Sequence, residues 1–270
     1  MEIIFLDGEP LKEKIPLRSL LYGEGVFETF RWKGSPPVYL NKHINRMKMG
    51  SEFLAIPFPG KRSIKTAVEE AIKISKIADA YVKVCLLSSG GMKFHERPKE
   101  GHVLVIVRKH EPQKENVRAH IVQLRRTSSS PLLRVKSVNY LENVLARREA
   151  MSKGYDEAIF LNERGEVAEG SSTNIFWAKK ETLYTPAADC GLLPGITREA
   201  LISLAPEIGL NVVEGRFNLN EILSSDGAFL TNSLIGMTAL AGVDKVEIKL
   251  EGEFFAKLRT ALFKKFRWIA

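Results

Sequence analysis

The stretch LLRVKSVNYLENVLARREA, residues 132–150, joins a basic lead-in to an amphipathic helix. Its apolar residues Leu141, Val144 and Leu145 recur at helical spacing, so we expect them to pack and the charged residues to face solvent. Lys136 lies just before the helix, in a loop rich in serine and proline. A lysine held among cations or removed from water has a lowered pKa and becomes a nucleophile. Taken alone, one lysine among 40 lysines and arginines is typical of a solvated surface.

The composition is that of a soluble globular protein. The 270 residues, 44% hydrophobic and 27% charged, suffice for one large or two ordinary domains. No apolar run reaches the roughly 18 residues that cross a bilayer, so we expect no membrane partner. The N-terminus does not resemble a signal peptide, which indicates a cytoplasmic protein. Cys85 and Cys190 are not expected to form a disulfide there, and no Cys/His spacing predicts a metal.

The net charge of +8 raises the question of nucleic acid binding. The basic residues are spread along the chain, and no short window combines them with interleaved aromatic residues. We therefore expect no nucleic acid partner. A modest positive field also suits a small anionic substrate.

Hydrophobic periodicity divides the chain into two α+β domains. Residues 1–109 form a small α+β domain, residues 110–117 a polar linker, and residues 118–270 a larger, strand-rich domain. The most clearly patterned elements are strand 25–32, helices 41–54 and 61–76, strands 80–89 and 101–109, a helix from about Ile196, and a C-terminal helix over 254–267.

Two polar segments of the second domain could carry chemistry. VAEGSSTNIF (167–176) places Glu169 at the end of a strand, where a carboxylate could partner a cationic ring nitrogen. The alternative is an ordinary hairpin turn. GLLPGITREA (191–200) exposes the amides of Ile196 and Thr197 at a helix start, which is a place where anions bind. There the alternative is a simple helix cap.

Two further segments contain groups that suit a phosphate. FLTNSLIG (229–236) is a strand that ends in small hydroxyl and amide residues. NKHINRMKMG (41–50) places His43 and Arg46 on one helix face, and arginine is the natural phosphate ligand. A solvated helix face is the alternative for the second segment.

In this order, the segments resemble the fold-type IV enzymes that use pyridoxal 5′-phosphate (PLP). That family includes branched-chain aminotransferases, D-amino-acid aminotransferases and 4-amino-4-deoxychorismate lyases. The resemblance spans residues 18–239 and implies a small α+β domain, a linker, and a larger domain with a pseudobarrel-like sheet. It also implies PLP as cofactor and a homodimer. The segments that carry it are LLYGEGVFETFR, NKHINRM, VKSVNYLENVLARREA, EVAEGSSTNIF, LLPGITRE and FLTNSL.

The resemblance also implies residue roles. Lys136 matches the lysine that binds the cofactor covalently and then moves protons at the substrate carbon. Glu169 matches the carboxylate that keeps the pyridine nitrogen protonated, and Arg46 the phosphate-binding arginine. The further cofactor-binding residues are Tyr140, Ile196, Thr197, Asn232 and Ser233. The implied substrate-binding residues are Tyr22, Phe27, Thr29 and Arg31 on the second strand, with Lys93 and Arg97 as further cations for carboxylates.

Motif spacing favours a lyase within this family. KSVNY (136–140) is one residue shorter than the K-x-G-G-N-Y typical of branched-chain enzymes, and D-amino-acid enzymes and lyases share the shorter form. The R-x-H pair usual in D-specific enzymes is replaced by Lys-Phe-His at 93–95. SSGG (88–91), LEN (141–143) and TNS (231–233) match lyases.

The leading hypothesis is therefore a folate-pathway lyase that converts 4-amino-4-deoxychorismate to 4-aminobenzoate and pyruvate. Thr29 and Asn232 are candidates for orienting the departing side chain. The alternative is an aminotransferase that acts on branched-chain L-amino acids or on D-amino acids with a 2-oxo acid acceptor. A binding protein that merely kept the fold would have lost Lys136 or Glu169, and both are present.

Overall fold

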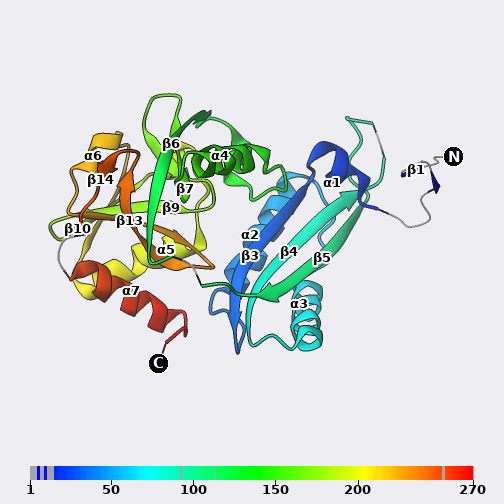
Figure 1. Cartoon of the computed structure of the whole chain (residues 1–270). Helices are drawn as coiled ribbons and strands as arrows, with labels where there is room; N and C mark the ends of the chain where they lie inside the picture. Colours follow the sequence, from blue (N-terminus) through cyan, green and yellow to red (C-terminus); the bar gives the residue numbers. More distant parts are fainter. Residues whose placement is uncertain are drawn as a thin grey trace.

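The described residues of the computed structural model form two sheets that lie side by side, a small one of three strands and a large one of nine (Figure 1). A separate two-stranded pairing joins β1 (Phe5–Leu6) to β2 (Glu9–Pro10). The structure describes residues 5–6, 9–10, 15–91, 93–112, 114–250 and 253–269.

The small sheet is antiparallel in the order β3-β4-β5, and two helices cover one of its faces. The predicted strands and helices of this region are confirmed to within about one residue. The bounds are α1 Leu17–Tyr22, β3 Gly25–Lys33, α2 Leu40–Phe53, α3 Lys61–Ser75, β4 Asp79–Ser89 and β5 Glu100–Lys109.

Alternation along β3 decides which side chains can reach a site. Val26 and Phe30 point into the core beneath α2 and α3, where they meet Ile44. Successive side chains of a strand point to opposite faces, so Phe27 and Thr29 face away from that core. This opposite face is the one turned toward the large sheet.

The last strand of the small sheet, β5, ends at Lys109, and the next strand along the chain, β6, belongs to the large sheet. The last two residues of the predicted linker, 110–117, lie in β6, which begins at Asn116. Val117 already pairs with Leu240 of the large sheet. Its side chain also packs against the core of that sheet, which explains why these last residues are strand.

The large sheet is curled and mixed, in the order β11-β10-β9-β12-β13-β6-β7-β8, with β14 paired to β13. The α+β class expected from the sequence is confirmed. Its strands are β6 Asn116–Arg126, β7 Glu157–Asn162, β8 Val167–Gly170, β9 Asn174–Lys179, β10 Thr182–Pro186, β11 Asn211–Gly215, β12 Gly227–Asn232, β13 Gly236–Val243 and β14 Val246–Glu247. Its helices are α4 Leu141–Ser152, α5 Ile196–Leu204, α6 Leu219–Leu223 and α7 Phe254–Lys265, with 3-10 turns at Pro131–Arg134, Ala188–Cys190 and Ala205–Ile208.

Helix α4 corrects one expectation. We expected its large apolar residues to pack, yet Leu141 is 62% exposed and Leu145 45% exposed. The buried residues are Ala146 and Ala150, which pack against the sheet with Phe160. Small side chains let the helix lie close to β6 and β7, and the leucines are left on the opposite side.

Two bulk features of the described residues bear on the class of protein. None of the helices there is long and apolar enough to cross a membrane. Both cysteines, Cys85 and Cys190, are free and buried.

Candidate active site

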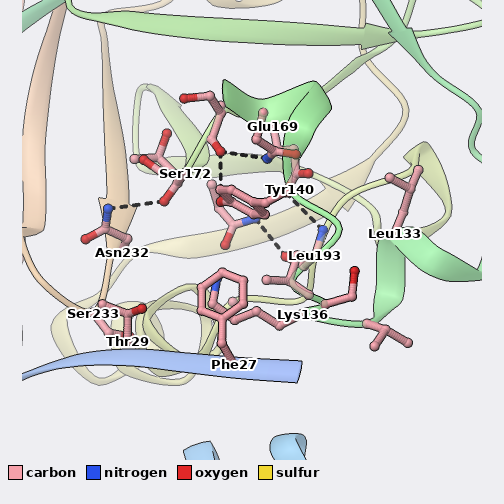
Figure 2. A pocket seen from close by; sticks show the side chains of 18 of the residues that line it. Phe27, Thr29, Leu133, Lys136, Tyr140, Glu169, Ser172, Leu193, Asn232 and Ser233 are labelled. Atoms are coloured by element: carbon pink, nitrogen blue, oxygen red, sulfur yellow. Dashed lines mark hydrogen bonds between the residues drawn. The ribbon is translucent and has the colours of Figure 1, made fainter. Parts of the chain in front are cut away.

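A cavity of about 520 Å³ lies between the two sheets and is lined by both (Figure 2). Its size is within the range of about 300–1,000 Å³ typical of small-molecule sites. Most of the residues singled out from the sequence line it: Phe27, Thr29, Arg46, Lys136, Tyr140, Glu169, Ile196, Thr197, Asn232 and Ser233. The tertiary structure thus brings together segments that lie up to two hundred residues apart.

Lys136 is held between the sheets because its loop pairs with the free edge of β3. The Phe27 amide donates to the Lys136 carbonyl at 2.8 Å, and the Val138 amide donates to the Gly25 carbonyl at 2.9 Å. A bridge between Val26 and Ser137 completes this pairing. An edge strand has unpaired backbone groups, and here they fix the loop that presents the lysine.

The Lys136 amine is suited to nucleophilic chemistry. It lies 4.5 Å from the centre of the Phe27 ring and 5.8 Å from that of Tyr140 (Figure 2). Burial, which is the largest cause, and the nearby Arg46 charge together lower its pKa to about 8. The residue as a whole is half-buried, but its amine is enclosed by the cavity. An amine with this pKa is partly neutral, and therefore nucleophilic, near neutral pH.

Glu169 offers a buried carboxylate at the end of β8. One oxygen accepts a hydrogen bond from Arg126 Nη2 at 3.2 Å, and the other accepts from the Leu193 amide at 3.0 Å. Burial raises the pKa of this carboxyl despite the neighbouring Arg126 and Lys136. A carboxylate in such a site gains most from a cationic partner, which a protonated ring nitrogen would supply.

The start of α5 offers backbone amides to an anion. Ile196 and Thr197 begin the helix, and its N-cap, Gly195, contributes no side-chain cap. The Thr197 hydroxyl lies 3.2 Å from that of Ser233. A Cβ on Gly195 would come within 2.0 Å of the Asn174 side-chain oxygen, so a larger residue there would force that side chain to move. These groups form the anion site expected at a helix N-terminus.

Arg46 enters the cavity from α2. Its guanidinium donates to both oxygens of Glu28, at 2.7 and 2.8 Å, and to the Pro194 carbonyl at 3.0 Å. Pro194 lies two residues before the start of α5 at Ile196. The arginine therefore reaches from the small sheet to the edge of the anion site.

Two predicted substrate residues on or near β3 have side chains that contact other parts of the protein and not the cavity. Arg31 donates to both oxygens of Asp79, at 2.7 and 2.6 Å, and its guanidinium lies 4.8 Å from the Trp268 ring. The Tyr22 ring packs against that of Phe94, 5.2 Å away. Neither residue lines the cavity.

The two predicted cations of the β4–β5 loop also lie outside the cavity. Lys93 and Arg97 are exposed side chains on a loop at the far end of the small sheet. Arg18 holds this loop by donating to the carbonyls of Gly91 and Lys93. The SSGG motif lies in the same region, so its residues do not line the cavity either.

Sequence reasoning missed several cavity residues. Tyr81 and Lys83 alternate with buried valines on β4 and reach the cavity from its exposed face. Lys83 pairs with Thr29 across the sheet, a register that no local pattern reveals. Its amine lies 4.3 Å from the centre of the Phe27 ring. The remaining missed groups include Arg126, Asn174 and Leu193.

The groups present fit PLP. A buried lysine, a buried carboxylate and an uncapped helix start converge on one cavity. The Thr231 hydroxyl is buried at the cavity wall without a partner among the described residues, as a wall built around a polar ligand would leave it. Lys136, Glu169, Arg46 and the start of α5 would hold the cofactor.

Comparison with known proteins also points to a PLP enzyme. Residues 25–243 match the family model for class IV amino-transferases. The chain is 32% identical to an aminodeoxychorismate lyase of Bacillus subtilis, over 97% of this chain and 94% of that protein. It is also 32% identical to a Methanocaldococcus jannaschii protein provisionally named a branched-chain-amino-acid aminotransferase, over 94% and 91%. A Legionella pneumophila structure provisionally named a 4-amino-4-deoxychorismate lyase superposes with a TM-score of 0.87, at 30% identity and over 92% and 93%.

The fold is that of the fold-type IV enzymes that use PLP. The chain belongs to the class IV aminotransferase family. Members of this family depend on PLP, and the chain is accordingly a PLP-dependent enzyme. Its relatives include both lyases and aminotransferases at the same identity, so the reaction has to be argued from the site.

Proposed function

We propose that the protein is a lyase that converts 4-amino-4-deoxychorismate to 4-aminobenzoate and pyruvate. The observation that carries the proposal is a set of hydroxyl and amide groups, Thr29 from the small sheet and Thr231–Ser233 from the large one, in the cavity of Lys136. Expelling an enolpyruvyl group benefits from a donor at the departing oxygen, which transamination does not need. The short KSVNY spacing supports the same choice.

The residues of the chain divide the chemistry among them. PLP, when bound, supplies an electron sink for the charge left at the amine-bearing carbon. Lys136 takes the proton from that carbon, and Glu169 keeps the ring nitrogen positive. The electron pair of the broken C–H bond forms the double bond that completes the aromatic ring. The C–O bond breaks at the same time, and its electron pair leaves with the oxygen. The Lys136 ammonium then returns a proton, which the enolate takes up as pyruvate forms.

Cations of the cavity suit a substrate with two carboxylates. Arg46 and Arg126 are each paired with carboxylates of the protein. Lys83 has no ion pair among the described residues, and its amine rests over an aromatic ring. We therefore assign Lys83 to a substrate carboxylate, in place of the cations that lie outside the cavity. Attraction of this kind raises both affinity and the rate of encounter.

Thr29 is the donor that we assign to the departing oxygen. It faces the cavity from β3, and its hydroxyl makes no side-chain hydrogen bond in the part of the chain that the structure describes. Thr29→Val keeps the shape of the side chain and removes the donor, so we expect kcat to fall about 10²-fold. Steady-state kinetics test this, with the cofactor absorbance unchanged; an unaltered kcat would remove Thr29 from the mechanism.

The proposal is tested by incubating the purified enzyme with 4-amino-4-deoxychorismate alone. We expect equal amounts of 4-aminobenzoate and pyruvate without any added acceptor. If turnover instead requires a branched-chain or D-amino acid together with a 2-oxo acid, the enzyme is an aminotransferase. Running both assays on one preparation compares the two reactions directly.

We further propose a cytoplasmic homodimer that acts in folate biosynthesis. Leu104 and Ile106 of β5 are exposed on the sheet face opposite α2 and α3, and α1 exposes Leu20 and Leu21, so the small domain presents apolar surface. The two free cysteines are consistent with a reducing compartment. Analytical ultracentrifugation tests the assembly, and a monomer at micromolar concentration would contradict it.

A further inference from the structure

Glu28 is an acidic residue on the face of β3 that packs into the hydrophobic core, where an apolar residue is expected. It alternates with Val26 and Phe30 on β3, and those neighbours belong to the core beneath α2. The residue is only 1% exposed. An ionised carboxylate removed from water is costly unless it is paired and hydrogen-bonded. A break of the hydrophobic pattern at such a cost is expected where function requires it.

Two residues from one turn of α2 pair with the Glu28 carboxylate and offset the cost of its burial. Glu28 Oε1 accepts from Arg46 Nε at 2.7 Å, and Oε2 accepts from Arg46 Nη2 at 2.8 Å. Oε2 also pairs with His43 Nδ1 at 2.6 Å. Burial by itself would raise the pKa of Glu28, but Arg46 and His43 outweigh it and hold the pKa at about 2. The carboxylate is therefore charged at all working pH values.

The pairing determines which edge of Arg46 faces the cavity. A guanidinium has five N–H donors in a rigid plane. Two of them go to Glu28 and one to the Pro194 carbonyl. These three contacts fix the plane of the guanidinium and leave one N–H donor on Nη1 and one on Nη2. Donors on two nitrogens of one fixed plane suit the oxygens of a phosphate.

We propose that Glu28 is a positioning residue, which holds the guanidinium of Arg46 in the orientation that binds the phosphate of the cofactor. His43 assists through its contact with Oε2, the carboxylate oxygen that also accepts from Arg46 Nη2. The inference rests on the proposed role of Arg46 at the phosphate. A purely structural Glu28, which only ties α2 to β3, would support all ligands of the cavity equally.

The experiment compares PLP with pyridoxal, the same molecule without its phosphate. Each is titrated into enzyme freed of cofactor, and binding is followed by visible absorbance. For Glu28→Gln we expect the dissociation constant of PLP to rise about 10-fold to 100-fold, because a charged hydrogen-bond pair is lost. The dissociation constant of pyridoxal should stay within about threefold. An equal loss of affinity for both ligands would overturn the proposal.

Two further variants keep the outcomes separate. Glu28→Asp retains the charge, but its side chain is one methylene too short for the two contacts with Arg46. We therefore expect the same selective loss of PLP affinity. This variant tests the proposal if Glu28→Gln does not fold. Glu52→Gln removes an exposed ion pair with Lys48 on the same helix, and we expect no change.

Arg46→Met distinguishes failure of the inference from failure of the proposed site. If Arg46→Met does not weaken PLP relative to pyridoxal, Arg46 is not the phosphate ligand and the proposed site is at fault. If it does, while both Glu28 variants bind the two ligands like the wild type, the positioning role of Glu28 is wrong and the site stands.

Discussion

Lys136→Ala should lose about 10⁴-fold in kcat or more, because general acid–base catalysis and covalent attachment of the cofactor are removed together. The wild-type protein should be yellow, and the variant should lack the absorption band of the lysine-bound cofactor. The amine is enclosed by the cavity, with a pKa of about 8. The neutral form is the nucleophile, so attachment of PLP to cofactor-free enzyme should speed up with pH and level off above about 8.

Lys83 offers a matched control for this variant. Its amine lies over the same Phe27 ring, on the side of β4. Lys83→Ala should keep the colour and raise KM, because only a substrate contact is lost. A colourless wild-type protein, or a Lys136→Ala protein that retains the band, would exclude the proposed role of Lys136.

Glu169→Gln should lower kcat by roughly 10²-fold to 10³-fold, the range seen when one preorganised electrostatic contact is removed. The amide can still accept from the Leu193 amide, which now binds the carboxylate at 3.0 Å. A neutral side chain cannot keep the ring nitrogen protonated, so the electron sink is weakened while the cofactor stays attached to Lys136. Stopped-flow and steady-state assays of the reconstituted enzyme measure the loss.

Glu142→Gln is the control for Arg126, because this arginine pairs with both Glu142 and Glu169. Arg126 bridges Glu169 and Glu142, and the Glu142 side chain is 66% exposed. An exposed ion pair contributes about 0–1 kcal/mol, so kcat should change by less than about fivefold. Equal losses in the two variants would indicate that Arg126, rather than a charge on the ring nitrogen, explains the effect of Glu169.

Local elements were predictable because their causes are local. Helix 41–54 is observed as Leu40–Phe53, since its apolar spacing and the prolines before it act within a few residues. The helix predicted from about Ile196 is likewise observed to begin at that residue. The packing of α4 was misread, because periodicity cannot distinguish a face that covers the sheet from one left on the surface.

Among the candidate site residues, those found from motif order line the cavity, whereas the predicted role of Arg31 depended on contacts between distant segments. Lys136, Glu169 and Arg46 stood out through motif order, and all three line one cavity. Arg31 has the right residue type on the right strand, yet Asp79 and Trp268 occupy its side chain. These partners come from distant segments, so only the folded chain shows that the arginine is engaged.

The sequence by itself determined the class of enzyme and the cofactor and singled out Lys136 as the candidate lysine, because these depend on the identity and order of residues in short segments. The tertiary structure decided which cations face the cavity and how they are held. Lys83 reaches the cavity through the cross-strand register with Thr29, and Glu28 acquires its role by meeting Arg46 across the core. Contacts between distant segments form only when the sheets pack, so no pattern within a segment encodes them. The stretch 132–150 contains the amine, and the edge of β3 decides where that amine points.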